Sequence, residues 1–108
     1  MTIITEEMFR VRLVKVLSEY HYEVKSVTGP GRSGAIAAVY TSHYLGIPFL
    51  AYGTKVPEQL KPVLVVDTAI QSGRTLRKAT RKYDSFFAIA FFQEPPRVKF
   101  WYEKETYD

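Results

Sequence analysis

The sequence has no cysteine, and its only histidines are His21 and His43. The lack of cysteine excludes a disulfide framework, thiol chemistry and zinc sites with cysteine ligands. Two histidines so far apart in the sequence do not form a metal-ligand pattern. Any chemistry of this chain therefore depends on carboxylates, hydroxyls, amides, cations and backbone groups.

Long apolar runs are also absent, since runs such as residues 63–66 and 86–92 have only the length of a strand. A membrane-spanning helix needs about 20 apolar residues, and the first residues, "MTIITEEMF", lack the layout of a signal peptide. The net charge of +4 favours anionic partners, but the lysines and arginines form no run that would indicate nucleic acid. We expect a cytoplasmic protein with no membrane partner.

The chain of 108 residues is 46% hydrophobic and 15% aromatic, and no repeat or linker divides it. It has the size of a single domain, residues 1–108, with a substantial core. Apolar residues at helical spacing predict a helix after Thr5, a residue type that caps helices. The apolar face of this helix consists of Phe9, Leu13, Val16, Leu17 and Tyr20.

Strands and helices alternate along the rest of the chain. Two further helices are predicted over residues 35–45, ending at Gly46, and over residues 74–83. The pattern predicts an α/β fold, with a mostly parallel five-stranded sheet, helices on both faces and an antiparallel last pair as an option. The connector 53–62 has room for one helical turn. The strands are predicted over residues 23–29, 47–52, 63–67, 85–92 and 98–103.

The stretch "VLVVDTAIQSGRTL", residues 63–76, changes from a buried strand to a polar turn and then to a helix. Asp67 is the first polar residue of the strand, so it marks the edge at which the sheet opens to solvent. Ser72, Gly73 and Thr75 supply two hydroxyls and a permissive backbone where the N–H groups of a helix start lack partners. These features are typical of a phosphate-binding turn.

A second stretch, "VTGPGRSG", residues 27–34, has the same order of strand end, glycines and helix start. Its glycines allow close approach of the backbone, and Arg32 adds a charged fork. Both turns follow strands of one parallel sheet, so we expect them at the same edge, where they could hold the two phosphate ends of one ligand. The anion-binding candidates of this stretch are Gly29, Pro30, Gly31, Arg32, Ser33 and Gly34.

These two stretches resemble the signature motifs of the type I phosphoribosyltransferase family, and the resemblance covers roughly residues 24–102. It implies that the chain binds phosphoribosyl pyrophosphate with Mg²⁺, held mainly by the substrate and without direct metal ligands from the protein. It also implies a catalytic role for Asp67 beside the ribose and pyrophosphate binding by residues 29–34. The implied ribose and 5-phosphate contacts are Asp67, Thr68, Ala69, Ile70, Gln71, Ser72, Gly73, Arg74 and Thr75.

The chain departs from the family pattern at several places. Thr68 stands where the family has a second acidic residue, so one negative charge beside the ribose is lost. Gln71 stands where some purine-using members have an aspartate that manages the base proton, and an amide is no general base. Residues 53–62 are too few for the family's mobile hairpin, and little sequence remains for its base-recognising hood. The chain therefore resembles a minimal core of the family.

Polar and aromatic residues near the ends of the last two predicted strands are candidates for contact with a base. Aromatics at such positions also pack ordinary cores and interfaces. In the same way, Asp67 could cap the turn that follows it, and Arg32 could be an ordinary surface residue. The base-proximal candidates are Phe92, Gln93 and Trp101, with Tyr102 as a further aromatic at this end of the chain.

The sequence supports three hypotheses. The first is a phosphoribosyltransferase, a pentosyl-group glycosyltransferase of nucleotide metabolism, which moves phosphoribosyl to a nucleobase or similar nitrogen acceptor and releases pyrophosphate. The second is a non-catalytic module of the same fold that binds phosphoribosyl pyrophosphate or a nucleotide. The third is an interaction or nucleic-acid-binding protein whose two turns have lost their ligand. We favour the first, with small-molecule partners and a homodimer as an assembly that the sequence allows.

Overall fold

The computed structural model describes residues 2–20, 23–70, 73–85, 87–93 and 98–103. Strands and helices alternate along them, which confirms the predicted α/β class. In chain order the elements are β1 (Thr2–Ile4), α1 (Glu6–Ser18), β2 (Ser26–Thr28), α2 (Gly31–Leu45), the 3₁₀ turn η1 (Glu58–Leu60), β3 (Val63–Ile70), α3 (Arg74–Lys82), β4 (Ala88–Gln93) and β5 (Val98–Phe100).

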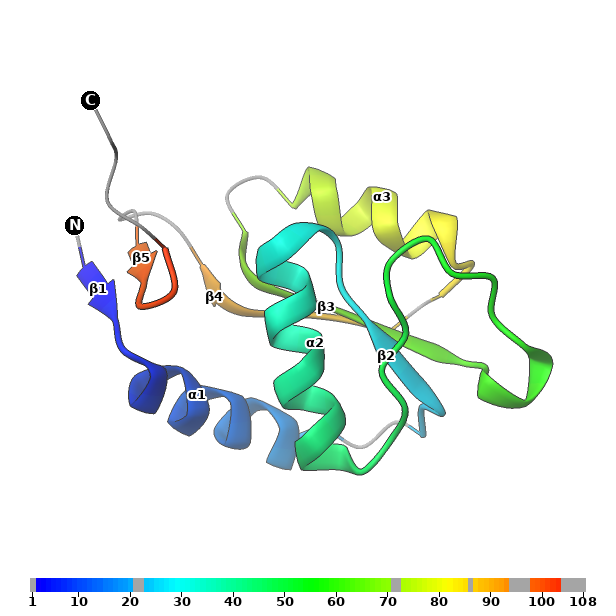
Figure 1. Ribbon diagram of the computed structural model, residues 1–108, viewed down its shortest axis with the longest axis horizontal. Coiled ribbons are helices and arrows are strands. Elements are labelled where there is room, and N and C mark those ends of the chain that lie inside the picture. The colour runs from blue at the N-terminus through cyan, green and yellow to red at the C-terminus, as the bar shows by residue number, and fades with distance from the viewer. Residues whose placement is uncertain (1, 21–22, 71–72, 86, 94–97, 104–108) are drawn as a thin grey trace.

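The centre of the fold is a three-stranded parallel sheet in the order β2–β3–β4 (Figure 1). Val65 of β3 pairs with Thr28 of β2 on one side and with Ala88 of β4 on the other. The first four residues of β3, 63–66, are buried. The aliphatic run of this strand therefore matches its central place, where both faces are covered.

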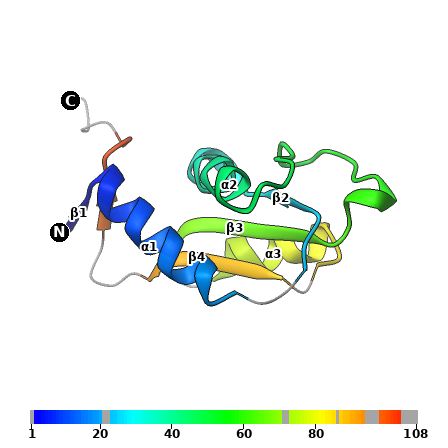
Figure 2. The ribbon, with the colours of Figure 1, turned by 90° about the horizontal axis from the view of Figure 1, so that it is seen from below.

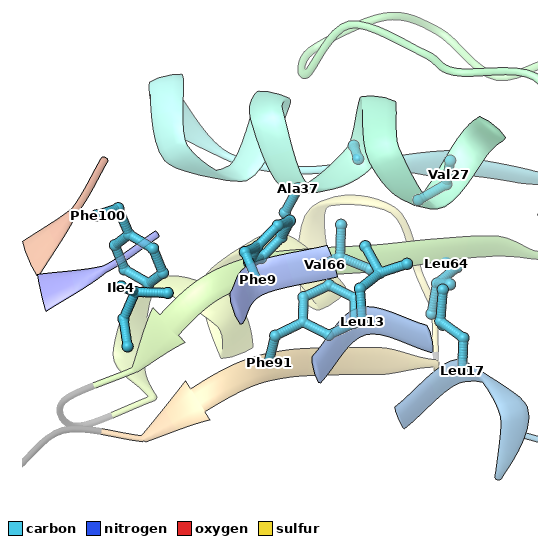
Figure 3. Packing of buried hydrophobic residues seen from close by; sticks show 11 residues of the cluster. Ile4, Phe9, Leu13, Leu17, Val27, Ala37, Leu64, Val66, Phe91 and Phe100 are labelled. Atoms are coloured by element: carbon cyan, nitrogen blue, oxygen red, sulfur yellow. The ribbon is translucent and has the colours of Figure 1, made fainter. Parts of the chain in front are cut away.

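Helices cover both faces of the sheet, as the sequence predicts. One core cluster joins Phe9 of α1 and Ala37 of α2 to Leu64 and Val66 of β3 (Figure 3). Helix α3 lies across the sheet from α1 (Figure 1), and its Ala79 is fully buried. The alternation of side chains along β3 thus supplies one apolar layer to each face.

Helices α1 and α2 show the predicted start and end signals. Thr5 caps α1, because its hydroxyl accepts a hydrogen bond from the Met8 N–H at 3.1 Å. The predicted apolar face of α1 is confirmed, with Phe9, Leu13 and Leu17 buried and Val16 partly buried against the core; Tyr20 also packs against the core but lies beyond the end of the helix at Ser18. Gly46 ends α2 with a φ of 68°, which confirms the left-handed cap.

Helix α2 begins at Gly31, whereas the sequence predicts its start at residue 35. Arg32, Ser33 and Gly34 form its first turn instead of a loop, and the Gly34 N–H donates to the Pro30 carbonyl at 3.0 Å. The glycines of this stretch suggested a loop by their composition. In the fold, Gly34 is needed inside the helix because another backbone segment lies against it.

Strand β5 pairs in parallel with β1 in a separate two-stranded sheet, with Ile4 opposite Phe100. Figures 1 and 2 place this sheet beyond the carboxyl ends of β3 and β4. The five strands are therefore divided between two sheets, and the antiparallel option for the last pair is wrong, since β5 does not pair with β4 and instead pairs in parallel with β1. Strand β5 leaves the central sheet because it pairs with β1, a strand that the sequence analysis did not predict.

The predicted strand over residues 47–52 is reduced to one bridge, between Phe49 and Val27. Its ladder consists of the Val27 N–H bonded to the Pro48 carbonyl at 3.0 Å and the Leu50 N–H bonded to the Val27 carbonyl at 2.8 Å. Pro48 has no N–H to donate, which limits the pairing. The connector that follows holds η1, as predicted. No helix in the described ranges is long and apolar enough to cross a membrane.

Candidate functional site

Asp67 lies near the carboxyl end of β3, after four buried aliphatic residues. Its Oδ1 accepts a hydrogen bond from the Thr68 N–H at 2.8 Å. Burial raises the pKa of Asp67 to about 6, and the hydrogen bond from Thr68 lowers it only in part. A carboxyl group with this pKa is mostly ionised at pH 7, in surroundings where its negative charge is poorly solvated. Such a charge interacts strongly with a cationic centre placed beside it.

The start of α2 lies directly against this part of β3. A Cβ added to Gly29 would come within 2.1 Å of the Gly34 carbonyl oxygen and 2.6 Å of the Val66 carbonyl oxygen. A Cβ added to Gly34 would come within 2.6 Å of the Gly29 carbonyl carbon. Because Val66 immediately precedes Asp67, these contacts bring the two predicted anion-binding stretches together at one edge of the sheet.

Two helix starts meet this edge, at Gly31 of α2 and Arg74 of α3. Their N-cap residues are Pro30 and Gly73, and among the described residues no side chain caps either start. Gly73 has a φ of 77°, a conformation that favours glycine at the turn into α3. A helix start of this kind favours an anion, because its first N–H groups have no acceptor within the helix and the helix dipole favours negative charge there.

A tyrosine from the C-terminal part of the chain connects the two stretches. The Tyr102 hydroxyl hydrogen-bonds to Ser33 Oγ, at 2.8 Å, and to Thr68 Oγ1, at 3.3 Å. Burial raises the pKa of Tyr102, so its phenol is protonated at neutral pH. Sequence spacing gave no signal for these contacts, because Tyr102 is 69 positions from Ser33 and 34 positions from Thr68.

The other predicted contacts of the ribose and 5-phosphate lie on both sides of the β3–α3 turn. Ala69 and Ile70 are partly buried at the end of β3, and Arg74 and Thr75 are exposed in the first turn of α3. Arg32 is exposed in the first turn of α2. Gln71 and Ser72 lie outside the described residues.

The two aromatic base-proximal candidates, Phe92 and Trp101, pack against the hydrophobic core. Phe92 contacts Phe9 and Phe100, with ring centroids 6.3 and 5.5 Å apart. Trp101 lies 5.5 Å from Phe9 and is partly buried. Gln93 is exposed at the end of β4. The two aromatics therefore have the packing contacts of an ordinary aromatic cluster at the same end of the sheet as Asp67.

At this edge of the sheet, Asp67 is the carboxylate that a cation could contact. The described residues contain no group of three or more metal-ligating side chains. Magnesium sites commonly use one or two carboxylates, waters and the phosphates of a substrate. The donors present thus fit a Mg²⁺ ion that arrives with a phosphorylated ligand, but do not form a closed protein cage.

A groove of about 600 Å³ lies elsewhere, between α1 and α2. It is lined partly by Arg10, Val14, Val39 and His43. The groove contains none of the residues that the sequence marks as anion-binding or base-proximal. We therefore assign the candidate site to the carboxyl edge of the sheet.

Comparison of the structure with solved structures identifies the fold. The Helicobacter pylori xanthine-guanine-hypoxanthine phosphoribosyltransferase superimposes with a TM-score of 0.73 and 15% identity, covering 94% of this chain and 90% of that chain. A purine phosphoribosyltransferase from Pyrococcus horikoshii gives a TM-score of 0.64 and 18% identity, covering 100% and 99%. No family model and no curated protein matches the sequence. The fold is that of the type I phosphoribosyltransferases, as the sequence motifs predicted.

Proposed function

We propose that this chain is a phosphoribosyltransferase, which binds phosphoribosyl pyrophosphate and transfers the phosphoribosyl group to a nucleobase or similar nitrogen acceptor. The observation that carries the proposal is the contact of Gly29 with Gly34 and Val66, which holds the start of α2 against the strand segment that immediately precedes Asp67. The start of α3 follows the same strand, so a donor with phosphate at both ends would bind one helix start with each end. The shared fold with two phosphoribosyltransferases supports the same reaction class.

In this proposal each stretch binds one end of the donor. The turn into α3, with Gly73 and Thr75, binds the 5-phosphate through N–H groups and a hydroxyl. The first turn of α2, with Arg32, binds the pyrophosphate. The donor is then held at both ends, so that the anomeric carbon lies between them and near Asp67.

Asp67 stabilises the transition state of the proposed reaction. The bond from the anomeric carbon to the pyrophosphate oxygen breaks, and its electron pair leaves with pyrophosphate. The acceptor nitrogen forms the new bond to carbon and passes its proton to solvent water. Positive charge develops on the ribose during this exchange, and the poorly solvated carboxylate of Asp67 is well suited to stabilise it. A bound Mg²⁺, held mainly by the phosphates of the donor, would neutralise their charge.

A second candidate function is binding of the same ligand without transfer. It is favoured by Thr68, whose hydroxyl is hydrogen-bonded to Tyr102 and supplies no negative charge to the ribose. Under this reading the protein responds to phosphoribosyl pyrophosphate or a nucleotide as a regulatory module. Release of pyrophosphate in the presence of candidate bases separates the two functions.

The first test is calorimetric titration with phosphoribosyl pyrophosphate, with and without Mg²⁺. We expect saturable binding that Asp67→Asn and Arg32→Ala each weaken by about tenfold or more, since each variant removes a charged contact. Matched controls are Asp84→Asn and Arg81→Ala, because both residues are exposed at the other end of α3. These controls change the net charge equally and should leave the affinity unchanged.

The absence of binding at millimolar ligand would contradict the proposal. Equal losses in the site variants and their controls would also contradict it, because a non-specific charge effect would then explain the affinity. Tight binding to oligonucleotides that falls steeply with salt and survives Asp67→Asn would instead support the third hypothesis, a nucleic-acid-binding protein.

A further inference from the structure

Tyr102 connects three parts of the molecule that are distant in sequence. Its hydroxyl contacts Ser33 in the first turn of α2 and Thr68 near the end of β3. Thr68 is almost fully buried, with 3% of its surface exposed. These two contacts span the same two stretches that the proposed function assigns to the two ends of its donor.

The ring of Tyr102 is held by the small β1–β5 sheet. It stacks on Phe100, with centroids 5.5 Å apart and an interplanar angle of 16°, and meets Trp101 edge-on at 5.0 Å. The Trp101 N–H donates to the Ile4 carbonyl at 2.9 Å, and the Glu103 N–H donates to the Phe100 carbonyl at 3.0 Å. The position of the hydroxyl is thus determined by a second sheet, independently of the two stretches that it contacts.

The phenol hydroxyl has few ways to act on a ligand directly. It has one hydrogen to donate and two lone pairs, and Ser33 and Thr68 already use part of this capacity. Removing the hydroxyl would leave the side chains of Ser33 and Thr68 without a common partner. The contacts of the Tyr102 hydroxyl therefore act by fixing the distance between the first turn of α2 and the end of β3.

We propose that Tyr102 is a positioning residue, whose hydroxyl fixes the spacing between the first turn of α2 and the carboxyl end of β3 that a ligand with two phosphate-bearing ends must span. This inference rests on the proposed function and explains how the two parts of that site are held at a fixed spacing. A ligand that binds both stretches gains from preset spacing, because less ordering is needed on binding. A ligand that binds only one stretch gains nothing from it.

Comparison of one double-ended ligand with two single-ended ligands tests this role. Tyr102→Phe keeps the ring and removes the hydroxyl. We expect its affinity for phosphoribosyl pyrophosphate to fall by about tenfold, the usual effect of losing a buried hydrogen-bond partner. Its affinities for inorganic pyrophosphate and for ribose 5-phosphate should remain within about twofold of the wild type, since each of these ligands needs only one stretch.

Tyr83→Phe is the matched control. The Tyr83 hydroxyl accepts a hydrogen bond from the Gly53 N–H at 2.5 Å, at the other end of α3, so this variant also loses one phenolic contact between distant segments. We expect it to bind all three ligands as the wild type does. An equal loss of affinity for all three ligands in Tyr102→Phe would overturn the proposal, as would unchanged or tighter binding of phosphoribosyl pyrophosphate.

Hydrogen exchange of the ligand-free protein tests the same role without any ligand. Tyr102→Phe should increase amide exchange at Gly34, whose N–H is bonded to the Pro30 carbonyl in the first turn of α2, and in residues 66–70 of β3, relative to Tyr83→Phe. Unchanged exchange at these two places would overturn the positioning role. If the wild-type protein binds none of the three ligands, the proposed function fails, and the exchange measurement alone then decides the role of Tyr102.

Discussion

At the scale of single residues, the chemistry of the site is concentrated in Asp67. The side chain follows a buried aliphatic run, and its burial raises its pKa to about 6 from a usual value of 3.8. Keeping this group ionised costs folding free energy. Such a cost is common at functional sites, because a well-solvated carboxylate would interact more weakly with a developing cation.

The pH dependence of stability follows from this pKa. Between about pH 4 and pH 6 the folded state binds more protons at Asp67 than the unfolded state does, so the free energy of unfolding falls as the pH rises. The loss is complete above about pH 6. Asp67→Asn has no carboxyl group to ionise, so its free energy of unfolding does not fall in this way. At pH 7 the variant should be more stable than the wild type by about 1 kcal/mol, a value reduced for partial solvation of the carboxyl group.

Thermal unfolding of both proteins between about pH 4 and pH 8 measures this effect. The difference in Tm should be close to zero near pH 4 and reach about 4 °C or more above pH 6. Asp84→Asn controls for the loss of one carboxylate from the net charge. A difference between Asp67→Asn and the wild type that does not vary with pH would contradict the prediction.

At the scale of elements, the site depends on how closely α2 approaches the sheet. Gly29 and Gly34 have no side chains, and this lets the start of α2 lie against the backbone of β3 at Val66. Because Val66 immediately precedes Asp67, the same contact brings the start of α2 to the strand segment that carries Asp67. Close packing of α2 on the sheet and the proposed ligand binding therefore both require residues without a side chain at these two positions.

Gly29→Ala should separate α2 from β3. Its methyl group would meet two backbone carbonyl oxygens, and backbone atoms cannot move aside as a flexible side chain can. We expect a loss of about 3 kcal/mol in the free energy of unfolding, measured by urea denaturation.

Gly31→Ala is the comparison variant. Gly31 has a φ of 66° and open space where the Cβ would lie, so its substitution costs only backbone strain, about 1 kcal/mol. Equal costs for Gly29→Ala and Gly31→Ala would show that close packing is not the reason for Gly29.

At the scale of the whole molecule, an aromatic cluster joins the two sheets. Phe9 of α1 lies at its centre, with ring contacts to Phe91 of β4 at 5.6 Å, to Phe100 of β5 at 6.3 Å and to Trp101 at 5.5 Å. Through these contacts α1 connects the central sheet to the β1–β5 sheet (Figures 1 and 3). Edge-on and tilted aromatic pairs of this kind add to the stabilisation from burial.

Phe9→Ala tests the importance of this cluster for the fold. The side chain is fully buried, so its removal leaves a cavity and should lower the free energy of unfolding by about 3–5 kcal/mol. Emission from Trp101, the single tryptophan, should also move to longer wavelength as its ring loses a packing partner.

Met8→Ala is the control, because Met8 is 44% exposed on the same helix and should cost about 0.5 kcal/mol or less. If Phe9→Ala changes stability as little as this control does, the aromatic cluster does not hold the two sheets together.

The local elements were largely predictable from the sequence. The apolar face of α1, the cap at Thr5, the left-handed cap at Gly46 and the start of α3 at residue 74 follow from periodicity and from residue types with a fixed conformational preference. Predictions that needed knowledge of neighbouring segments were less accurate. The sequence predicted a loop over residues 31–34, where the structure has the first turn of α2. Spacing along the chain does not reveal that Gly29 lies against Gly34 and Val66.

The sequence by itself determined the α/β class and the two stretches that carry the candidate chemistry, because both depend on the order and spacing of nearby residues. Only the tertiary structure decided that β5 pairs with β1 and that Tyr102 reaches Ser33 and Thr68. These contacts join residues that lie 34 or more positions apart in the chain. Their partners are chosen by the closing of long loops and by the packing of aromatic rings, which leave no periodic trace in the sequence.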